Sequence, residues 1–171
     1  HSLFLKGLEY VLDNTSVKAK AFIVGDGESR AAIQQVANSL GINYTKHTDS
    51  VHPHPLILTS WRMDVDTIFA GLDIIALTSL NEGTPVSLIE AQAAGKPIVS
   101  TRDGGIADVV LENRTALLSE ISDEKTFSDN LLMLVNDPSL RRKFSNAGKD
   151  YVISKFSYHR LVNDMSGLYH E

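Results

Sequence analysis

The chain has 171 residues, of which 43% are apolar and 22% are charged, a composition typical of a soluble globular protein that can bury one hydrophobic core. Its net charge of −5 disfavours general nucleic-acid binding, and no apolar run is long enough to span a bilayer. Cysteine is absent, which excludes a disulfide framework and a thiolate metal site. We therefore expect one domain over residues 1–171, located in the cytoplasm, with peripheral contact to a membrane surface left open.

Strands and helices alternate along the sequence. Apolar residues at helical spacing predict an opening helix over residues 3–12. Short apolar runs predict strands at 21–24, 42–46, 56–59, 73–78, 97–100 and 116–118. Helical patterns fill the intervals and continue beyond residue 122. This order predicts an α/β fold, with a parallel sheet flanked by helices and ligands bound at the carboxyl ends of its strands.

The most informative segment is residues 81–90, NEGTPVSLIE, which follows the buried run at 73–78. Thr84 is a favourable N-cap, and Pro85 suits the first position of a helix. Gly83 allows a ligand to approach the backbone, and the start of a helix attracts anions. A carboxylate cannot bind an anion, so Glu82 and Glu90 are suited to the neutral hydroxyl groups of a sugar or a ribose.

Other candidate residues have simpler interpretations. Gly25-Asp26-Gly27 has Arg30 where the dinucleotide fingerprint has a third glycine, which favours a strand-to-helix turn. Gly104-Gly105 fits either the lining of a ligand cleft or a structural turn. Trp61 is expected to be a packing residue rather than a platform for a base. The histidines are expected to be solvated loop residues rather than metal ligands: His47, His52 and His54.

The paired glutamates and the motifs around them resemble retaining glycosyltransferases of family 4. The resemblance rests on Glu82 and Glu90 in residues 82–91, on AQAAGKPIVST at 91–101 followed by Gly104-Gly105, and on FIVGDG at 22–27. It implies the GT-B arrangement, in which two Rossmann-like domains enclose a cleft. The chain resembles the second, C-terminal domain, which binds the nucleotide-sugar donor.

The resemblance also assigns roles to the candidate residues. Glu82 would be the catalytic-site residue that binds hydroxyl groups of the donor sugar, and Glu90 would bind both ribose hydroxyls. The segment of Gly83, Thr84, Pro85 and Val86 would receive the sugar and the diphosphate through backbone amides. Arg62 would contact the base. No metal or other cofactor is implied, and a uridine diphosphate sugar is the expected donor.

One expected element is missing from the sequence. In the resembled family the domain begins with a central strand followed by an arginine and a lysine that bind the diphosphate, whereas this chain opens on the helix after them. We therefore expect the sheet to lack its first strand and to show a gap or a compensating contact beside Val24 and Ile75. Direct pairing of residues 21–25 with 73–78 would contradict this expectation.

The leading functional hypothesis is the donor-binding domain of an enzyme that moves a sugar to an acceptor hydroxyl with retention of configuration. The acceptor would be a glycan, a lipid-linked molecule or a small molecule, bound through an N-terminal domain outside this chain. A nucleotide-sugar epimerase or a sugar phosphorylase of similar fold remains an alternative. A non-catalytic nucleotide-binding module is a second alternative, and we expect the isolated chain to be inactive.

Overall fold

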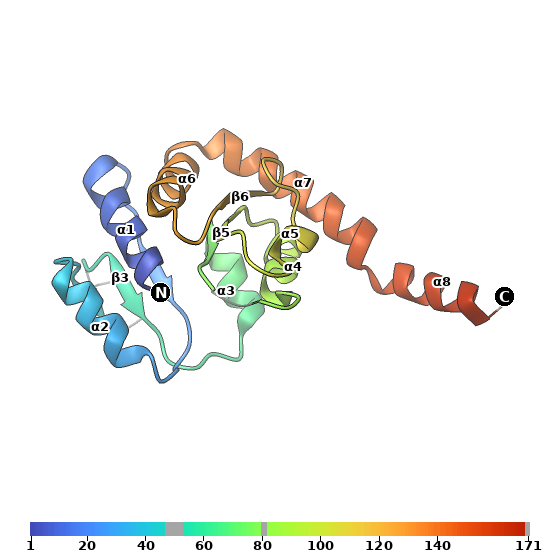
Figure 1. Cartoon of the computed structure of the whole chain (residues 1–171), viewed down its shortest axis with the longest axis horizontal. Coiled ribbons are helices and arrows are strands. Elements are labelled where there is room, and N and C mark those ends of the chain that lie inside the picture. The colour runs from blue at the N-terminus through green and yellow to red at the C-terminus, as the bar shows by residue number, and fades with distance from the viewer. Residues whose placement is uncertain (47–52, 80–81, 170–171) are drawn as a thin grey trace.

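The computed structural model describes residues 1–46, 53–79 and 82–169 (Figure 1). The strands are β1 (Ala21–Ile23), β2 (Tyr44–Thr45), β3 (Leu56–Leu58), β4 (Ile75–Leu77), β5 (Ile98–Thr101) and β6 (Ala116–Ser119). The helices are α1 (Ser2–Asn14), α2 (Arg30–Ser39), α3 (Val65–Gly71), α4 (Val86–Ala93), α5 (Ile106–Val109), α6 (Glu124–Asn136), α7 (Pro138–Phe156) and α8 (Tyr158–Tyr169). Every predicted strand is present, and the α/β class is confirmed.

The strands form two three-stranded parallel sheets, with the orders β1-β3-β2 and β4-β5-β6. In the first sheet Ala21 lies opposite Leu56, and in the second Ile75 lies opposite Ile98. Strands β5 and β6 are buried along their whole length, as is typical of parallel strands covered on both faces. The edge strand β4, in contrast, is only partly buried.

A cavity of about 1360 Å³ lies where the two sheets face each other, and we call it the slot. It is lined by β1 and β4 and by apolar side chains from α1, α3, α4 and α6, among them Val11, Phe69, Leu88 and Leu131. Strands β1 and β4 are not paired with one another. The expected gap beside Val24 and Ile75 is therefore confirmed, because no strand of the described residues lies between β1 and β4.

Helix α1 joins the two halves of the molecule. One face of it buries Leu5 and Leu8 in a cluster with β1, β3 and α2. Val11 belongs to a second cluster, with Val99 of β5 and Phe127 of α6. Gly7 permits this approach, because a Cβ at that position would lie 3.0 Å from the ring of Phe127. The remaining cluster packs α4 and α5 against β5 and β6.

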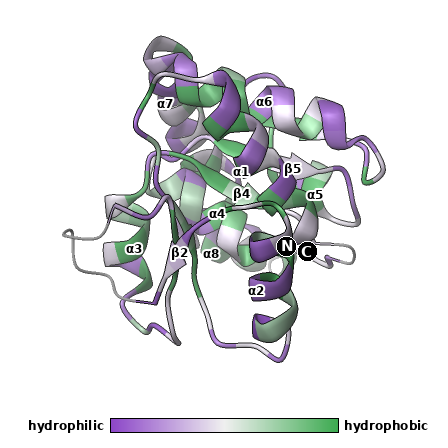
Figure 2. Cartoon of the chain, turned by 90° about the vertical axis from the view of Figure 1, so that its left-hand side faces the viewer, coloured by the Kyte–Doolittle hydropathy of each residue, from purple (hydrophilic) through white to green (hydrophobic). Residues whose placement is uncertain are grey.

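The last helix is much less covered than the others. Figure 1 shows α8 running away from the body of the molecule, and Figure 2 shows how polar and apolar residues are distributed over the chain, α8 included. None of the residues of α8 is buried, and Leu168 is 74% exposed. Across the described ranges, no helix is both long and apolar enough to cross a membrane.

Candidate functional site

The loop that carries Glu82 lies at the carboxyl edge of the second sheet. Strand β4 ends at Leu77, and α4 begins at Val86, so the predicted strand, glycine loop and helix occur in this order. Asn81, the first residue of the predicted segment, lies outside the described residues. Glu82 is partly buried and lines the end of the slot, whereas Gly83 and Thr84 are exposed. This edge is where a parallel α/β sheet binds its ligands.

The start of α4 differs from the prediction by one residue. Pro85, not Thr84, occupies the N-cap position, and the first helical residue is Val86. Pro85 has an extended backbone (φ −74°, ψ 91°), and its carbonyl accepts a hydrogen bond from the Leu88 amide at 3.0 Å. The Thr84 hydroxyl makes no capping bond. Because no side chain caps this helix, its first amide groups keep the capacity to bind an anion.

Glu90 lies on the exposed face of α4, together with Val86 and Ala93 at helical spacing. The opposite face buries Leu88 and Gln92. The buried side chain of Gln92 ties α4 to α5. Its Nε2 donates to the carbonyl of Leu88 within α4 at 3.1 Å and to that of Val109 in α5 at 2.8 Å. The helix is thus held rigidly by its buried face while Glu90 stays free to meet a ligand.

The turn at Gly104-Gly105 contacts the backbone of the loop that carries Glu82 and Gly83. The Gly105 amide donates to the carbonyl of Glu82 at 3.0 Å. A Cβ added at Gly104 would overlap the Glu82 carbonyl oxygen, and one at Gly105 would overlap that of Gly83. Gly104 also has a positive φ of +47°. The sequence left Gly104-Gly105 open between a cleft lining and a turn; the structure shows a turn that fixes the position of Glu82 and Gly83.

Asp103, which precedes this turn, was not predicted as a site residue. Its Oδ2 atom is buried and has no hydrogen-bond partner among the residues that the structure describes. Because a buried carboxylate oxygen needs a donor, the end of β5 retains an unused acceptor close to the glutamate loop. In the sequence, only the position of Asp103 next to Gly104-Gly105 could have indicated that it lies near the site.

Arg62 lies in the loop between β3 and α3. Its Nε donates to Asp64 Oδ1 at 2.8 Å, and its Nη2 also pairs with the same carboxylate. This hydrogen bonding lowers the pKa of Asp64 and raises the pKa of Arg62. Within the described parts of the chain, the side-chain hydrogen bonds of Arg62 go to Asp64 and none joins it to Glu82 or Gly83. The carboxylate orients the guanidinium, and the Arg62 side chain is 43% exposed.

Trp61, next to Arg62, is 75% exposed, so the prediction that it packs in the interior is wrong. Met63 is 87% exposed as well. Both residues lie in the loop between the end of β3 and the start of α3. The indole is therefore available to a ligand, which the sequence pattern could not reveal.

Only one of the three loop histidines lies among the residues that the structure describes. His47 and His52 lie outside the described residues, while His54 borders the slot. Within the part of the chain that the structure describes, no group of three or more histidine, aspartate or glutamate side chains could hold a metal ion.

Residues 1–151 match the sequence model of the family described as glycosyl transferases group 1. The chain belongs to this family. The match contains both glutamates, both glycine turns and the loop of Arg62.

Curated relatives of this group 1 chain are glycosyltransferases. It is 29% identical over 167 residues to UDP-Gal:alpha-D-GlcNAc-diphosphoundecaprenol alpha-1,3-galactosyltransferase of Escherichia coli, covering 97% of this chain and 41% of the relative. It is 28% identical over 158 residues to N-acetyl-alpha-D-glucosaminyl L-malate synthase of Bacillus anthracis, covering 92% and 39%. The chain therefore spans about two fifths of the length of these relatives.

Solved structures of GT-B glycosyltransferases share the fold. TarM of S. aureus, in a complex with fondaparinux, alpha-GlcNAc-glycerol and UDP, superposes with a TM-score of 0.83 at 20% identity, covering 99% of this chain and 32% of that one. The C-terminal domain of the group 1 protein LpcC from Francisella tularensis has a TM-score of 0.76 at 19% identity, covering 92% and 79%. The chain thus has the predicted fold of one domain of a GT-B glycosyltransferase.

Proposed function

We propose that this group 1 chain is the donor-binding domain of a retaining glycosyltransferase that takes a sugar from a nucleoside diphosphate, with uridine as the expected base. The observation that carries the proposal is the contact of Gly104-Gly105 with the Glu82-Gly83 backbone. It holds a carboxylate and an uncapped helix start side by side at the carboxyl edge of the sheet. The E. coli relative is named for a UDP-galactose donor, which supports this choice.

The sugar end of the donor would lie against Glu82. A carboxylate next to a diphosphate is disfavoured electrostatically unless it faces neutral groups, and sugar hydroxyls are neutral donors. The Gly105 amide neutralises none of this charge, because it bonds to the Glu82 backbone carbonyl and leaves the side chain free. Glu82 therefore orients the sugar, and we assign it no proton transfer.

The diphosphate would meet the segment from Gly83 to Val86. The exposed Gly83 has open space at its Cα, and the amides at the start of α4 point toward the same edge. As the bond to the sugar breaks, negative charge grows on the leaving diphosphate, and fixed amide dipoles stabilise it without reorganisation. Positioning and charge stabilisation are the catalytic contributions that these residues can make, and they require no metal.

The nucleoside end would use Glu90 and Arg62. Glu90 can accept hydrogen bonds from both ribose hydroxyls through its two oxygens. The partly exposed guanidinium of Arg62, oriented by Asp64, can stack on the base. We also propose that the enzyme is located in the cytoplasm.

The acceptor site would lie in a part of the protein outside this chain, since the chain covers only 41% of its E. coli relative. The acceptor would be a glycan, a lipid-linked molecule or a small molecule. The 171-residue chain alone would bind the donor weakly and transfer no sugar. A sugar phosphorylase or an epimerase would use similar donor contacts, and detection of a sugar phosphate formed from inorganic phosphate, or of an epimerised sugar, would separate these reactions.

The test is a titration of the isotope-labelled 171-residue chain followed by NMR, with UDP and with 2′,3′-dideoxy-UDP as ligands. Loss of a charge-assisted hydrogen bond to the ribose predicts that Glu90→Gln weakens UDP binding about tenfold. The same substitution would leave binding of the dideoxy analogue unchanged. Glu9→Gln, on α1, serves as the matched control and would change neither affinity. An equal loss for both ligands would reject the ribose role, and no binding of either would reject the donor site.

A further inference from the structure

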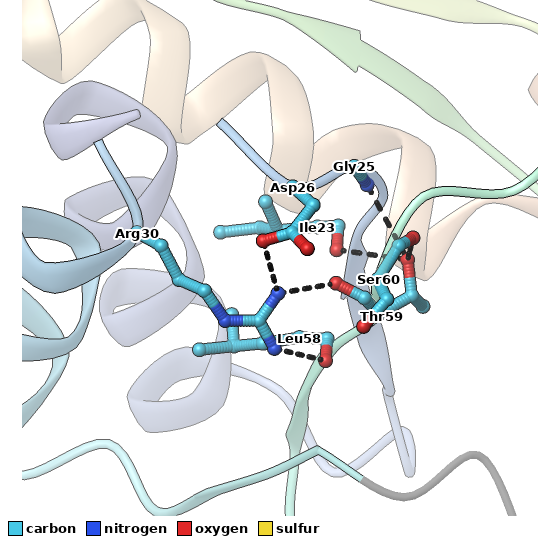
Figure 3. Close-up of polar contacts among 7 residues, drawn as sticks. All are labelled: Ile23, Gly25, Asp26, Arg30, Leu58, Thr59 and Ser60. Atoms are coloured by element: carbon cyan, nitrogen blue, oxygen red, sulfur yellow. Dashed lines mark hydrogen bonds and ion pairs between the residues drawn. The ribbon is translucent and has the colours of Figure 1, made fainter. Parts of the chain in front are cut away.

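Arg30 ties together two loops that are distant in sequence. It is the first residue of α2, and its side chain is only 23% exposed. One terminal nitrogen donates to the carbonyl of Thr59 at 2.9 Å and pairs with Asp26 at 3.3 Å, and the other donates to the carbonyl of Leu58 at 3.3 Å. Figure 3 shows this guanidinium lying between the turn after β1 and the end of β3.

The two carbonyls belong to the point where the chain leaves β3. A buried carbonyl at a strand end needs a donor, and the planar guanidinium supplies two parallel ones. Thr59 adds a second tie, because its hydroxyl accepts the Gly25 amide at 3.4 Å and donates to the carbonyl of Ser60 at 3.0 Å (Figure 3). The first two residues after β3 are thereby fixed to the turn after β1.

The residues that follow have few contacts of their own. Trp61 and Met63 are mainly exposed, and the next recorded anchor is the pair of Arg62 with Asp64 at the start of α3. A short loop between two anchors keeps its position only as long as both hold. The Arg30 contacts form the anchor on the β3 side.

We propose that Arg30 is a positioning residue that sets nucleotide affinity by holding the loop of Trp61 and Arg62 in its binding position. The nucleotide part of this inference rests on the proposed function, since that assigns Arg62 to the base. Arg30 acts through the loop, and the side chains of Asp26 and Thr59 complete its hold. If a variant holds the loop in place about a tenth of the time, the apparent dissociation constant rises about tenfold.

Trp61 provides a direct test because it is the only tryptophan in the chain. We would measure the fluorescence anisotropy decay of Trp61 in the full 171-residue chain and in Arg30→Met, which keeps an apolar stem and removes the guanidinium. The matched control is Arg141→Met. Arg141 likewise donates to two carbonyls, those of Leu134 and Val135 at 2.6 and 2.9 Å, but at the end of α6.

We expect Arg30→Met to add a fast, large-amplitude depolarising motion of Trp61, and Arg141→Met to leave the decay unchanged. Arg30→Lys, which keeps the charge but loses the second donor nitrogen, would give an intermediate decay and remains informative if Arg30→Met does not fold. An unchanged decay in Arg30→Met would overturn the proposal. An equal change in both methionine variants would overturn it as well, because that indicates general loosening.

A UDP titration of the same proteins separates this inference from the proposed function. About tenfold weaker binding by Arg30→Met, with unchanged binding by Arg141→Met, supports the positioning role in full. Equal affinity of Arg30→Met and the unaltered chain would overturn the link to nucleotide binding. If the unaltered chain does not bind UDP, the proposed function fails, while the anisotropy decays still decide whether Arg30 holds the loop.

Discussion

In the half of the molecule built on β1, β3 and β2, the loop leaving the sheet is held by a long side chain, that of Arg30. In the half built on β4, β5 and β6, the equivalent loop at Glu82 is held by backbone against backbone, through Gly104-Gly105. A side-chain tie can be weakened in steps, because a shorter or less branched cation still reaches one carbonyl. The backbone contact requires glycine at both positions, because any added side chain would overlap a carbonyl oxygen, so it cannot be weakened in small steps. The comparison indicates that the loop of Glu82, the proposed sugar end of the site, is built more rigidly than the loop of Arg62, the proposed nucleoside end.

The largest expected effect comes from filling the backbone contact. Gly104→Ala would place a Cβ on the Glu82 carbonyl oxygen at a residue with φ of +47°. Overpacking and backbone strain predict a loss of about 3 kcal/mol in the free energy of unfolding, measured by urea denaturation. Gly27→Ala is the control in the other half, because a Cβ there meets nothing within 4 Å. Equal stability losses in the two variants would remove the proposed difference between the loops.

A second, smaller effect would come from filling the slot between the halves. The amides of Ala21 and Ile75 bond to Pro55 and Pro97 on the neighbouring strands. Strand alternation therefore directs the amides of Phe22 and Ala76 into the slot. An engineered segment of about five β-branched residues, fused ahead of His1 through a short glycine-serine link, would pair with both edges.

Hydrogen exchange at Phe22 and Ala76 would slow about tenfold in this extended chain, equivalent to ~1.4 kcal/mol of added local stability. The same extension with a proline at its centre is the control, because proline cannot complete the ladder. Protection at only one of the two edges would show simple edge addition and would contradict insertion. Protection at neither would mean that the slot cannot accept a strand.

The smallest effect concerns the anchor of the Trp61 loop at α3. The pKa of Asp64 is lowered from 3.8, chiefly by its hydrogen bond with Arg62. A carboxyl group whose pKa falls on folding stabilises the folded loop above pH 3.8, and this contribution disappears as the pH falls through the lowered pKa. As the pH falls below 3.8 and through the lowered pKa of Asp64, the Trp61 anisotropy would therefore decrease. This decrease would precede the change in circular dichroism that reports global unfolding.

Asp64→Asn removes the titrating group and would abolish this pH dependence while leaving a residue that can cap the helix. A decrease of the same size in Asp64→Asn would assign the effect to general acid unfolding. The loop at Glu82 has no tryptophan, so this measurement reports only on the loop of Trp61 and Arg62.

Much of the fold was predictable, because strands and helices follow local periodicity. Leu56-Ile57-Leu58 forms a buried strand, and Gly41 and Gly95 follow the ends of α2 and α4 with positive φ values of 68° and 69°. The start of α4 was predicted one residue early, since Thr84 and Pro85 both fit an N-cap region and only the extended backbone of Pro85 decides between them. The interior position expected for Trp61 failed because composition does not reveal which loops a domain leaves uncovered.

The sequence by itself determined the order of strands and helices, the family resemblance and the placement of Glu82 and Glu90 around the start of one helix. Each of those features is recognised from short segments of the sequence, within which the residues lie only a few positions apart. Only the tertiary structure decided that Gly104-Gly105 supports Glu82 and that Arg30 supports Thr59, a residue 29 positions away. Such contacts join segments separated by whole strands and helices, so they depend on which strands lie side by side within each sheet and not on any local pattern.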